Sequence, residues 1–153
     1  MLGRVPAAGI TTSPDSAFMA QTARNLTDPV DGFLQGKRFL ILDRDTKFTD
    51  QFKRTLKGAG VASVLISYQA PNMNAVAERF VLSIKRECLS RLMLFGTRHL
   101  ERAVREHVEH YNAERPHQGL GNELIAGTPA LGAGEVVEHE RLGGLLRSYH
   151  RAA

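Results

Sequence analysis

Two carboxylates in this chain of 153 residues have the residue types and the spacing that suit metal chemistry. Asp43 directly follows the apolar run 39–42, and Glu78 comes later in the chain, with residues 44–77 between them. An acid at the end of a strand and an acid on a later helix can converge on one site. Mg²⁺ prefers carboxylate oxygens and keeps several of its waters. The pair therefore predicts a site for a divalent metal ion.

A third acid, Asp45, complicates this prediction. On an extended backbone, residues 43 and 45 face the same side. Asp45 can therefore share the metal site with Asp43 or replace it, and the local sequence leaves both possibilities open.

The elements around Asp43 follow from periodicity and capping. Residues 38–42 are almost continuously apolar, which predicts a strand that is buried on both faces, as in a parallel sheet. Thr49 can cap a helix that ends at Gly58 and Gly60, and residues 61–67 form the next strand. A strand–helix–strand unit of this length implies parallel pairing of the two strands.

Further elements are expected on either side of this unit. The patterns predict a strand at 2–9, helices at 13–26, 74–94 and 98–112, and a helical tail near 138–150. Ser13 followed by Pro14 is a typical helix start. In the long helix, an apolar stripe through Phe80 and Ile84 places Glu78 at the rim of a core.

Charge favours a polyanionic partner. The chain carries a net charge of +4, and residues 79–105 hold seven basic side chains against Glu87 and Glu101, which gives that segment +5. Clustered positive charge beside a metal site suits a phosphate backbone. The other reading is a solvated helical face without a partner.

Composition excludes several classes of protein. No apolar run approaches the ~20 residues needed to cross a bilayer, and the first residues lack the apolar centre of a signal peptide. The only cysteine, Cys88, cannot form an internal disulfide and reads as a small core residue. We expect a cytoplasmic protein, associated with the nucleoid when it is bound to DNA.

Several motifs extend the pattern around the two acids. Phe48 follows Asp43 by five positions, and Lys85 follows Glu78 by seven. The remaining matches are Pro71, Asn74 and Glu78 in a Pro-x-x-Asn-x-x-x-Glu pattern, the run Tyr111-Asn112-Ala113-Glu114-Arg115-Pro116-His117-Gln118-Gly119-Leu120, and Thr128-Pro129. Over residues 38–130, this order and spacing resemble the catalytic core of integrases and transposases of the aspartate–aspartate–glutamate superfamily. The turn after Asp43 departs from the family pattern, because Arg44 and Asp45 replace the usual asparagine and glycine.

The resemblance implies an α/β, ribonuclease H-like core at residues 1–120, followed by a carboxyl-terminal tail at 121–153. It also implies metal-dependent DNA strand transfer, with Asp43 and Glu78 as catalytic ligands of Mg²⁺ or Mn²⁺. The implied DNA-binding residues are Arg79, Lys85, Arg86, Arg115 and His117. The alternative reading of Lys85 is one more exposed lysine. Arg115 and His117 stay open between DNA contact and packing.

The first aspartate of the family pattern has no counterpart upstream of Asp43. Asp15 lies in a predicted helix cap, while Asp28 and Asp31 lie in a predicted loop. We therefore expect an incomplete core without its first strands, which is inactive on its own. The alternative is a non-enzymatic remnant that binds DNA or intact transposase. The expected partners are DNA and either intact transposase or a second copy of this chain, without a membrane or a small-molecule substrate.

Overall fold

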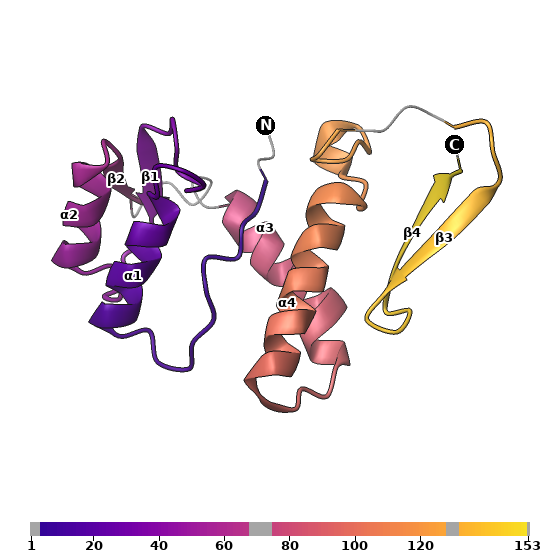
Figure 1. Ribbon diagram of the computed structural model, residues 1–153, viewed down its shortest axis with the longest axis horizontal. Helices are drawn as coiled ribbons and strands as arrows, with labels where there is room; N and C mark the ends of the chain where they lie inside the picture. The colour runs from indigo at the N-terminus through magenta and orange to yellow at the C-terminus, as the bar shows by residue number, and fades with distance from the viewer. Residues whose placement is uncertain (1–3, 68–74, 128–131, 153) are drawn as a thin grey trace. The chain divides into compact units, whose positions relative to one another are not determined.

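The structure is a computed structural model that describes residues 4–67, 75–127 and 132–152. The chain divides into two compact units. The amino-terminal unit is Ala8–Glu78, and the carboxyl-terminal unit combines Arg79–Ala153 with Met1–Ala7. Figure 1 labels the helices and strands of both units.

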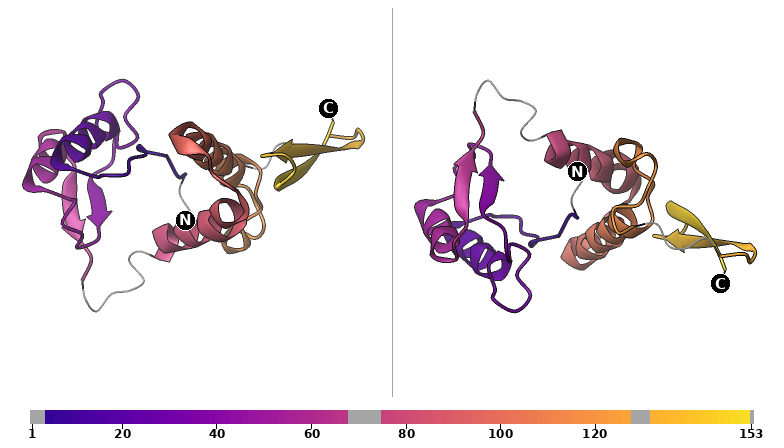
Figure 2. Two further views of the ribbon diagram at one scale, coloured as in Figure 1. Left: turned by 90° about the horizontal axis from the view of Figure 1, so that it is seen from below. Right: turned by 90° about the horizontal axis from the view of Figure 1, so that it is seen from above.

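The amino-terminal unit is built around a strand–helix–strand motif. Its elements are α1 (Ser16–Leu26), β1 (Phe39–Leu42), α2 (Asp50–Gly58) and β2 (Ala62–Leu65). The two strands pair in parallel, in a register that runs from Phe39 opposite Ala62 to Leu42 opposite Leu65. The views of Figure 2 show these strands side by side. The parallel unit predicted from the sequence is confirmed, with slightly shorter strands.

Local side-chain caps explain where both helices begin. The Thr49 hydroxyl accepts a hydrogen bond from the backbone N–H of Phe52 at 3.3 Å, as the sequence predicts. The start of α1 differs from the prediction, because Asp15 and not Ser13 accepts the backbone N–H of Phe18, at 2.8 Å. Ser13 instead forms a short turn in which its N–H donates to the hydroxyl of Thr11. The helix therefore begins after the acid.

The core of this unit lies on one face of the sheet. It consists of Met19, Ala23, Leu34, Leu42, Phe52, Leu56 and Val61. Along β1, Leu42 is buried and Leu40 packs against the core, while Phe39 and Ile41 are 60% and 46% exposed. The prediction that this strand is buried on both faces is wrong. Within the unit, α1 and α2 supply core residues to a single face, so the side chains alternate.

The described part of the segment 2–9 does not form a strand, so that prediction is also wrong. The backbone N–H of Val5 instead donates to Oδ1 of Asn112 at 2.9 Å, and its C=O accepts from Nδ2 of Asn112 at 2.8 Å. A buried side-chain amide therefore takes the place of a neighbouring strand.

In the carboxyl-terminal unit, the expected long helix 74–94 is interrupted. α3 (Ala75–Ser83), whose first residues count with the other unit, continues into a π-helical turn at Ile84–Cys88 and a 3₁₀ turn at Leu89–Arg91. A π turn is wider than an α turn, so side chains beyond it shift around the axis. Ile84 and Cys88 are buried as predicted, but Val81, which the apolar stripe would also include, is 44% exposed.

A second long helix, α4 (Gly96–Ala113), packs on this segment. Ala103 of α4 joins Ile84 and Cys88 in a small core, with Phe80 and Val104 packed against it. The Cys88 thiol lies 3.7 Å from the carbonyl oxygen of Ala103, and burial raises the pKa of that thiol. The prediction of a helix near 98–112 and of a structural cysteine is confirmed.

The tail forms a β-hairpin, so the predicted helix near 138–150 is wrong. A 3₁₀ turn at Gln118–Leu120 precedes β3 (Val136–Arg141) and β4 (Leu146–Arg151), which pair antiparallel. The chain reverses at Leu142, Gly143 and Gly144, which all have positive φ. Two consecutive glycines with positive φ favour a hairpin turn, and this signal outweighs the helical appearance of the charged residues.

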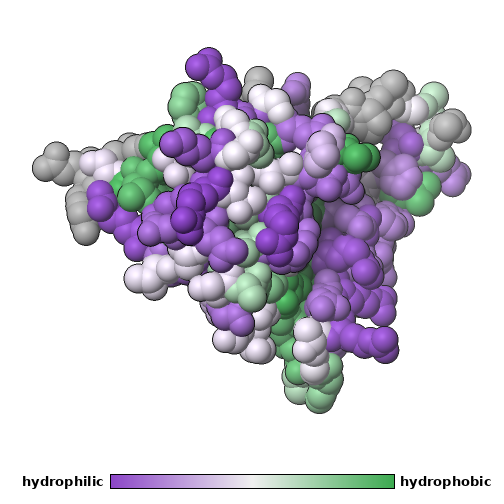
Figure 3. All heavy atoms as spheres, turned by 60° about the vertical axis from the view of Figure 1, so that its left-hand side comes forward, coloured by the Kyte–Doolittle hydropathy of each residue, from purple (hydrophilic) through white to green (hydrophobic). Residues whose placement is uncertain are grey.

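Hydrophilic side chains cover most of the face shown in Figure 3, and hydrophobic side chains appear there in separate patches. Within the described ranges, no helix has the length and hydropathy needed to cross a membrane.

Candidate functional site

Asp43 stands immediately after β1, where the chain leaves the sheet. Its Oδ1 accepts the backbone N–H of Asp45 at 3.1 Å, and its Oδ2 lies 4.0 Å from Nζ of Lys47. The side chain is 48% exposed. One carboxylate oxygen therefore organises the turn, and the other faces a cation at the limit of ion pairing.

Asp45 is engaged more completely. Its Oδ1 accepts the backbone N–H of Lys47 at 2.9 Å, and its Oδ2 lies 2.7 Å from Nζ of the same residue. The hydrogen bond from the Lys47 side chain lowers the pKa of Asp45, and the backbone bond adds to this effect. Because both Asp45 oxygens are occupied, Asp43 offers the more available carboxylate.

Glu78 lies in the first turn of α3 and is exposed. Its carboxylate forms no hydrogen bond or ion pair with any residue that the structure describes. Pro71 and Asn74 of the predicted motif lie outside the described residues. No group of three histidine, cysteine or acidic side chains in the described ranges forms a metal-binding cluster. The donor chemistry of Asp43 and Glu78 suits Mg²⁺, because both carry exposed carboxylate oxygens.

The basic side chains of residues 79–105 share one property. All seven are exposed, and their charged groups form no ion pair or hydrogen bond within the described part of the chain. They are Arg79, Lys85, Arg86, Arg91, Arg98, Arg102 and Arg105. Cations without internal partners are available to an external polyanion.

Arg115 has different surroundings. Its Nη1 donates to the hydroxyl of Ser83 at 2.5 Å and to Oε2 of Glu87, and its guanidinium lies 5.6 Å from the centre of the Tyr111 ring. The hydroxyl of Ser83 also donates to Oε2 of Glu87, at 3.2 Å. Sequence reasoning missed this network, which joins α3 and the π turn to the end of α4. The only signal was the position of Arg115 in a motif, because its partners lie 28 and 32 positions away.

A buried histidine completes the network. His107 is fully buried, its Nε2 lies 3.4 Å from the Ser83 hydroxyl, and its Nδ1 has no hydrogen-bond partner within the described part of the chain. Burial lowers the pKa of His107 to about 4. The charge of Glu87 opposes this shift, and the charge of Arg115 adds to it. His107 is therefore a neutral residue of the folded core at neutral pH.

His117 is also buried, with 5% of its surface exposed. Its Nε2 lies 2.8 Å from the backbone carbonyl oxygen of Tyr111, and the two rings meet edge to face with centres 4.7 Å apart. The Tyr111 ring also meets Phe80 edge to face at 5.0 Å. These contacts give Tyr111 and His117 a packing role. A DNA contact by His117 stays a prediction.

An acidic cluster connects α4 to the hairpin. Arg141 of β3 forms ion pairs with Glu106, Glu109 and Glu114, each at 2.7 Å. Burial opposes ionisation of Glu114, but the hydrogen bonds from Arg141 and His110 outweigh it and lower the pKa of Glu114 to about 2. The hydrogen bond to Glu114 raises the pKa of Arg141. The guanidinium of Arg141 therefore has a structural role, in which it connects the hairpin to the acids of α4 and its end.

Comparison with known proteins gives one match. Residues 59–123 match the family model described as "Integrase core domain". The matched segment includes Glu78, Lys85, Arg115 and His117 and begins after Asp43. No curated protein and no solved structure matches the chain.

Proposed function

We propose that this chain acts on DNA in integration or transposition, because residues 59–123 match the family model of an integrase core domain. In this proposal the fold is part of a ribonuclease H-like core, and Asp43 and Glu78 are its carboxylate ligands. The observation that carries the proposal is that one matched segment holds both Glu78 and seven exposed cations whose charged groups have no partner among the described residues. An acid and free cations together suit metal-assisted chemistry on a phosphate backbone.

Each side chain then has a defined task. Asp43 and Glu78 would hold Mg²⁺ or Mn²⁺, which when bound stabilises the attacking and leaving oxygens of a phosphoryl transfer. Lys85 and Arg86, in the π turn, bind phosphates and position the DNA. Lys47 partly neutralises the acidic turn, because its ammonium lies 4.0 Å from Oδ2 of Asp43.

We propose that residues 1–153 do not cleave or join DNA by themselves. Two-metal chemistry needs both ions to be placed, and the described residues hold no group of three metal ligands. The same observation favours a second candidate, a non-enzymatic module that binds DNA or an intact transposase. Both candidates require DNA or protein binding by the carboxyl-terminal unit, and they differ in whether Asp43 and Glu78 bind metal.

Binding to DNA tests the shared part of the proposal. We expect a labelled 20-base-pair duplex to bind without sequence preference, and the affinity to fall steeply with salt because phosphate contacts release counterions. Replacing Lys85, Arg86 and Arg91 by glutamine should lower the affinity about tenfold or more and reduce the salt slope by about 2.7. The control variant replaces Arg24, Lys37 and Arg38 by glutamine. It loses the same charge from exposed positions outside residues 79–105. Equal losses of affinity in the two variants would show that net charge alone causes the effect.

Activity separates the two candidates. The purified chain should leave a supercoiled plasmid intact with Mg²⁺ or Mn²⁺. Nicking that disappears in a Glu78→Gln variant would show that two carboxylates suffice and that the chain is itself an enzyme. Mn²⁺-dependent broadening of the NMR signals around Asp43 and Glu78 supports the enzyme core, whereas its absence at millimolar Mn²⁺ favours the non-enzymatic module.

A further inference from the structure

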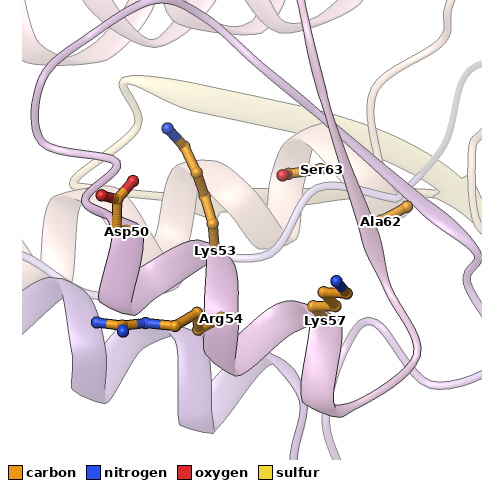
Figure 4. A pocket seen from close by; sticks show the side chains of 6 residues that line it. All are labelled: Asp50, Lys53, Arg54, Lys57, Ala62 and Ser63. Carbon is orange, nitrogen blue, oxygen red and sulfur yellow. The ribbon is translucent and has the colours of Figure 1, made fainter.

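An open cavity of about 540 Å³ lies in the amino-terminal unit, beside α2. Its lining comes from one face of α2 and from the start of β2: Asp50, Lys53, Arg54, Lys57, Ala62 and Ser63. Figure 4 shows the side chains of Lys53, Arg54 and Lys57 leaving α2, with Ser63 on the neighbouring strand. We call this lining the α2 trough.

The trough is basic because of the periodicity of α2. Phe52 and Leu56 point into the core, so position 54 falls on the opposite side of the helix and positions 53 and 57 lie beside it. The charged groups of the three cations form no ion pair or hydrogen bond within the residues that the structure describes. Asp50 is the one acid of the lining, which leaves a net charge of +2 from three cations and one carboxylate.

These groups are chemically suited to phosphate. Lysine offers a compact point charge, and the arginine fork matches the oxygens of a phosphate. The Ser63 hydroxyl adds a neutral donor at the edge of the same cavity. Lys53 and Lys57 are one helical turn apart, about 6 Å along the axis, and over that distance a duplex presents roughly three phosphate charges. An open cavity also suits a long polyanion better than an enclosed small molecule.

We propose that the α2 trough binds the phosphodiester backbone of duplex DNA, as a second contact surface in addition to the cations of residues 79–105. This inference rests on the proposed function. The turn that carries Asp43 leads directly into α2 through the capping residue Thr49. A phosphate held by α2 therefore fixes the DNA to the same unit that carries Asp43.

Binding of a labelled 20-base-pair duplex between 50 and 200 mM NaCl tests the inference. The variant Lys53→Gln, Arg54→Gln, Lys57→Gln should bind about tenfold more weakly at 100 mM, and its salt slope should fall by about 2.7 if all three cations meet phosphates. The matched control is again Arg24→Gln, Lys37→Gln, Arg38→Gln, which removes three exposed cations from the same unit. The control should lose less than about threefold.

Two further measurements keep the outcome decisive. Far-UV circular dichroism and the melting temperature should match the parent chain, since none of the three side chains belongs to the buried residues of α2. The charge-retaining variant Lys53→Arg, Lys57→Arg should keep near-parental affinity, because a DNA backbone accepts either cation. Failure of this rescue in a folded variant would overturn the inference.

The other outcomes also decide. The inference of a second contact surface is wrong if the trough variant keeps its affinity for the duplex. It is also wrong if the trough and control variants lose affinity equally. If the trough variant binds normally while the Lys85, Arg86 and Arg91 variant does not, the proposed function stands and only this inference fails. Displacement of the duplex by millimolar pyrophosphate to the same extent in parent and trough variant would likewise place the DNA elsewhere.

Discussion

The two units hold their polar side chains in different ways. In the amino-terminal unit, Asp43, Asp45 and Lys47 interact within five consecutive positions, and the acids remain exposed. In the carboxyl-terminal unit, Arg115 reaches Ser83 and Glu87 across 32 and 28 positions, beside the buried His107. Groups that can do chemistry are therefore held by a local turn, whereas the polar residues of the closing motif hold elements together.

The same contrast divides the basic side chains. Arg115 and Arg141 are committed to internal carboxylates, so they contribute to the fold before they can contribute to DNA binding. The charged groups of the cations of α2 and of residues 79–105 have no such partners in the described ranges. Internal pairing, and not the number of cations, therefore decides which parts of a basic chain can meet a phosphate.

The largest effect on stability is expected when the pH falls and His107 becomes protonated in the unfolded chain. Its pKa is about 4 in the folded chain against 6.5 for an unperturbed histidine, so the folded state favours the neutral ring. The resulting stability is complete above pH 6.5 and is lost as the pH falls toward 4. At pH 4.5 the loss attributable to His107 should be about 2–3 kcal/mol. Urea unfolding at pH 7.5, 5.5 and 4.5 measures it.

The variant His107→Phe should remove this part of the pH dependence and keep the aromatic contacts with Phe80 and Tyr111. It also eliminates the Nδ1 that has no partner among the described residues. The exposed His150, replaced by glutamine, serves as the control and should leave the pH profile unchanged. If His107→Phe and the parent chain lose equal stability between pH 7.5 and 4.5, the histidine is not buried as described.

A smaller effect is expected from Arg115→Ala. Removal of the guanidinium leaves the Ser83 hydroxyl and the Glu87 carboxylate without their shared donor, but Glu87 is 38% exposed and regains water. We expect a loss of about 1–2 kcal/mol in unfolding free energy. Arg86→Ala, at an exposed position, should cost less than about 0.5 kcal/mol.

DNA binding sharpens this comparison. Arg86→Ala should weaken the duplex complex at low salt, whereas Arg115→Ala should weaken it only under conditions where the fold is already lost. A folded Arg115→Ala chain with parental stability and reduced DNA affinity would assign Arg115 to the DNA interface and remove the distinction between the two sets of cations.

Local signals made much of the amino-terminal unit predictable. The Thr49 cap, the positive φ at Gly60 and the apolar run of β1 act within a few residues, so β1, α2 and β2 follow from the sequence. The exposed face of β1 does not follow from the sequence, because burial depends on which elements cover a sheet. A run of four apolar residues also shows no period-2 alternation of apolar and polar side chains.

The carboxyl-terminal unit was less predictable because distant contacts decide its structure. The π turn at Ile84–Cys88 coincides with the Ser83–Glu87 pair and its partner Arg115, which no local pattern reveals. The hairpin depends on a Gly-Gly turn and on the ion pairs that Arg141 forms with α4. For the candidate site, the acids remain a prediction from the sequence, and the structure adds that Lys47 engages Asp45 more closely than Asp43.

The smallest effect on stability is expected at Asp43, the residue with the largest proposed chemical role. Asp43→Asn keeps an oxygen that accepts the backbone N–H of Asp45, and it gives up only a contact of 4.0 Å to Lys47. The unfolding free energy should therefore change by less than about 0.5 kcal/mol. The same variant should abolish Mn²⁺-dependent broadening of NMR signals in the turn, whereas Asp45→Asn should preserve it because the oxygens of Asp45 already serve Lys47. The reverse result, with broadening lost only in Asp45→Asn, would transfer the metal-binding role to Asp45. A loss of several kcal/mol in Asp43→Asn would instead make this acid a structural residue like Arg115, and the contrast between the two units would disappear.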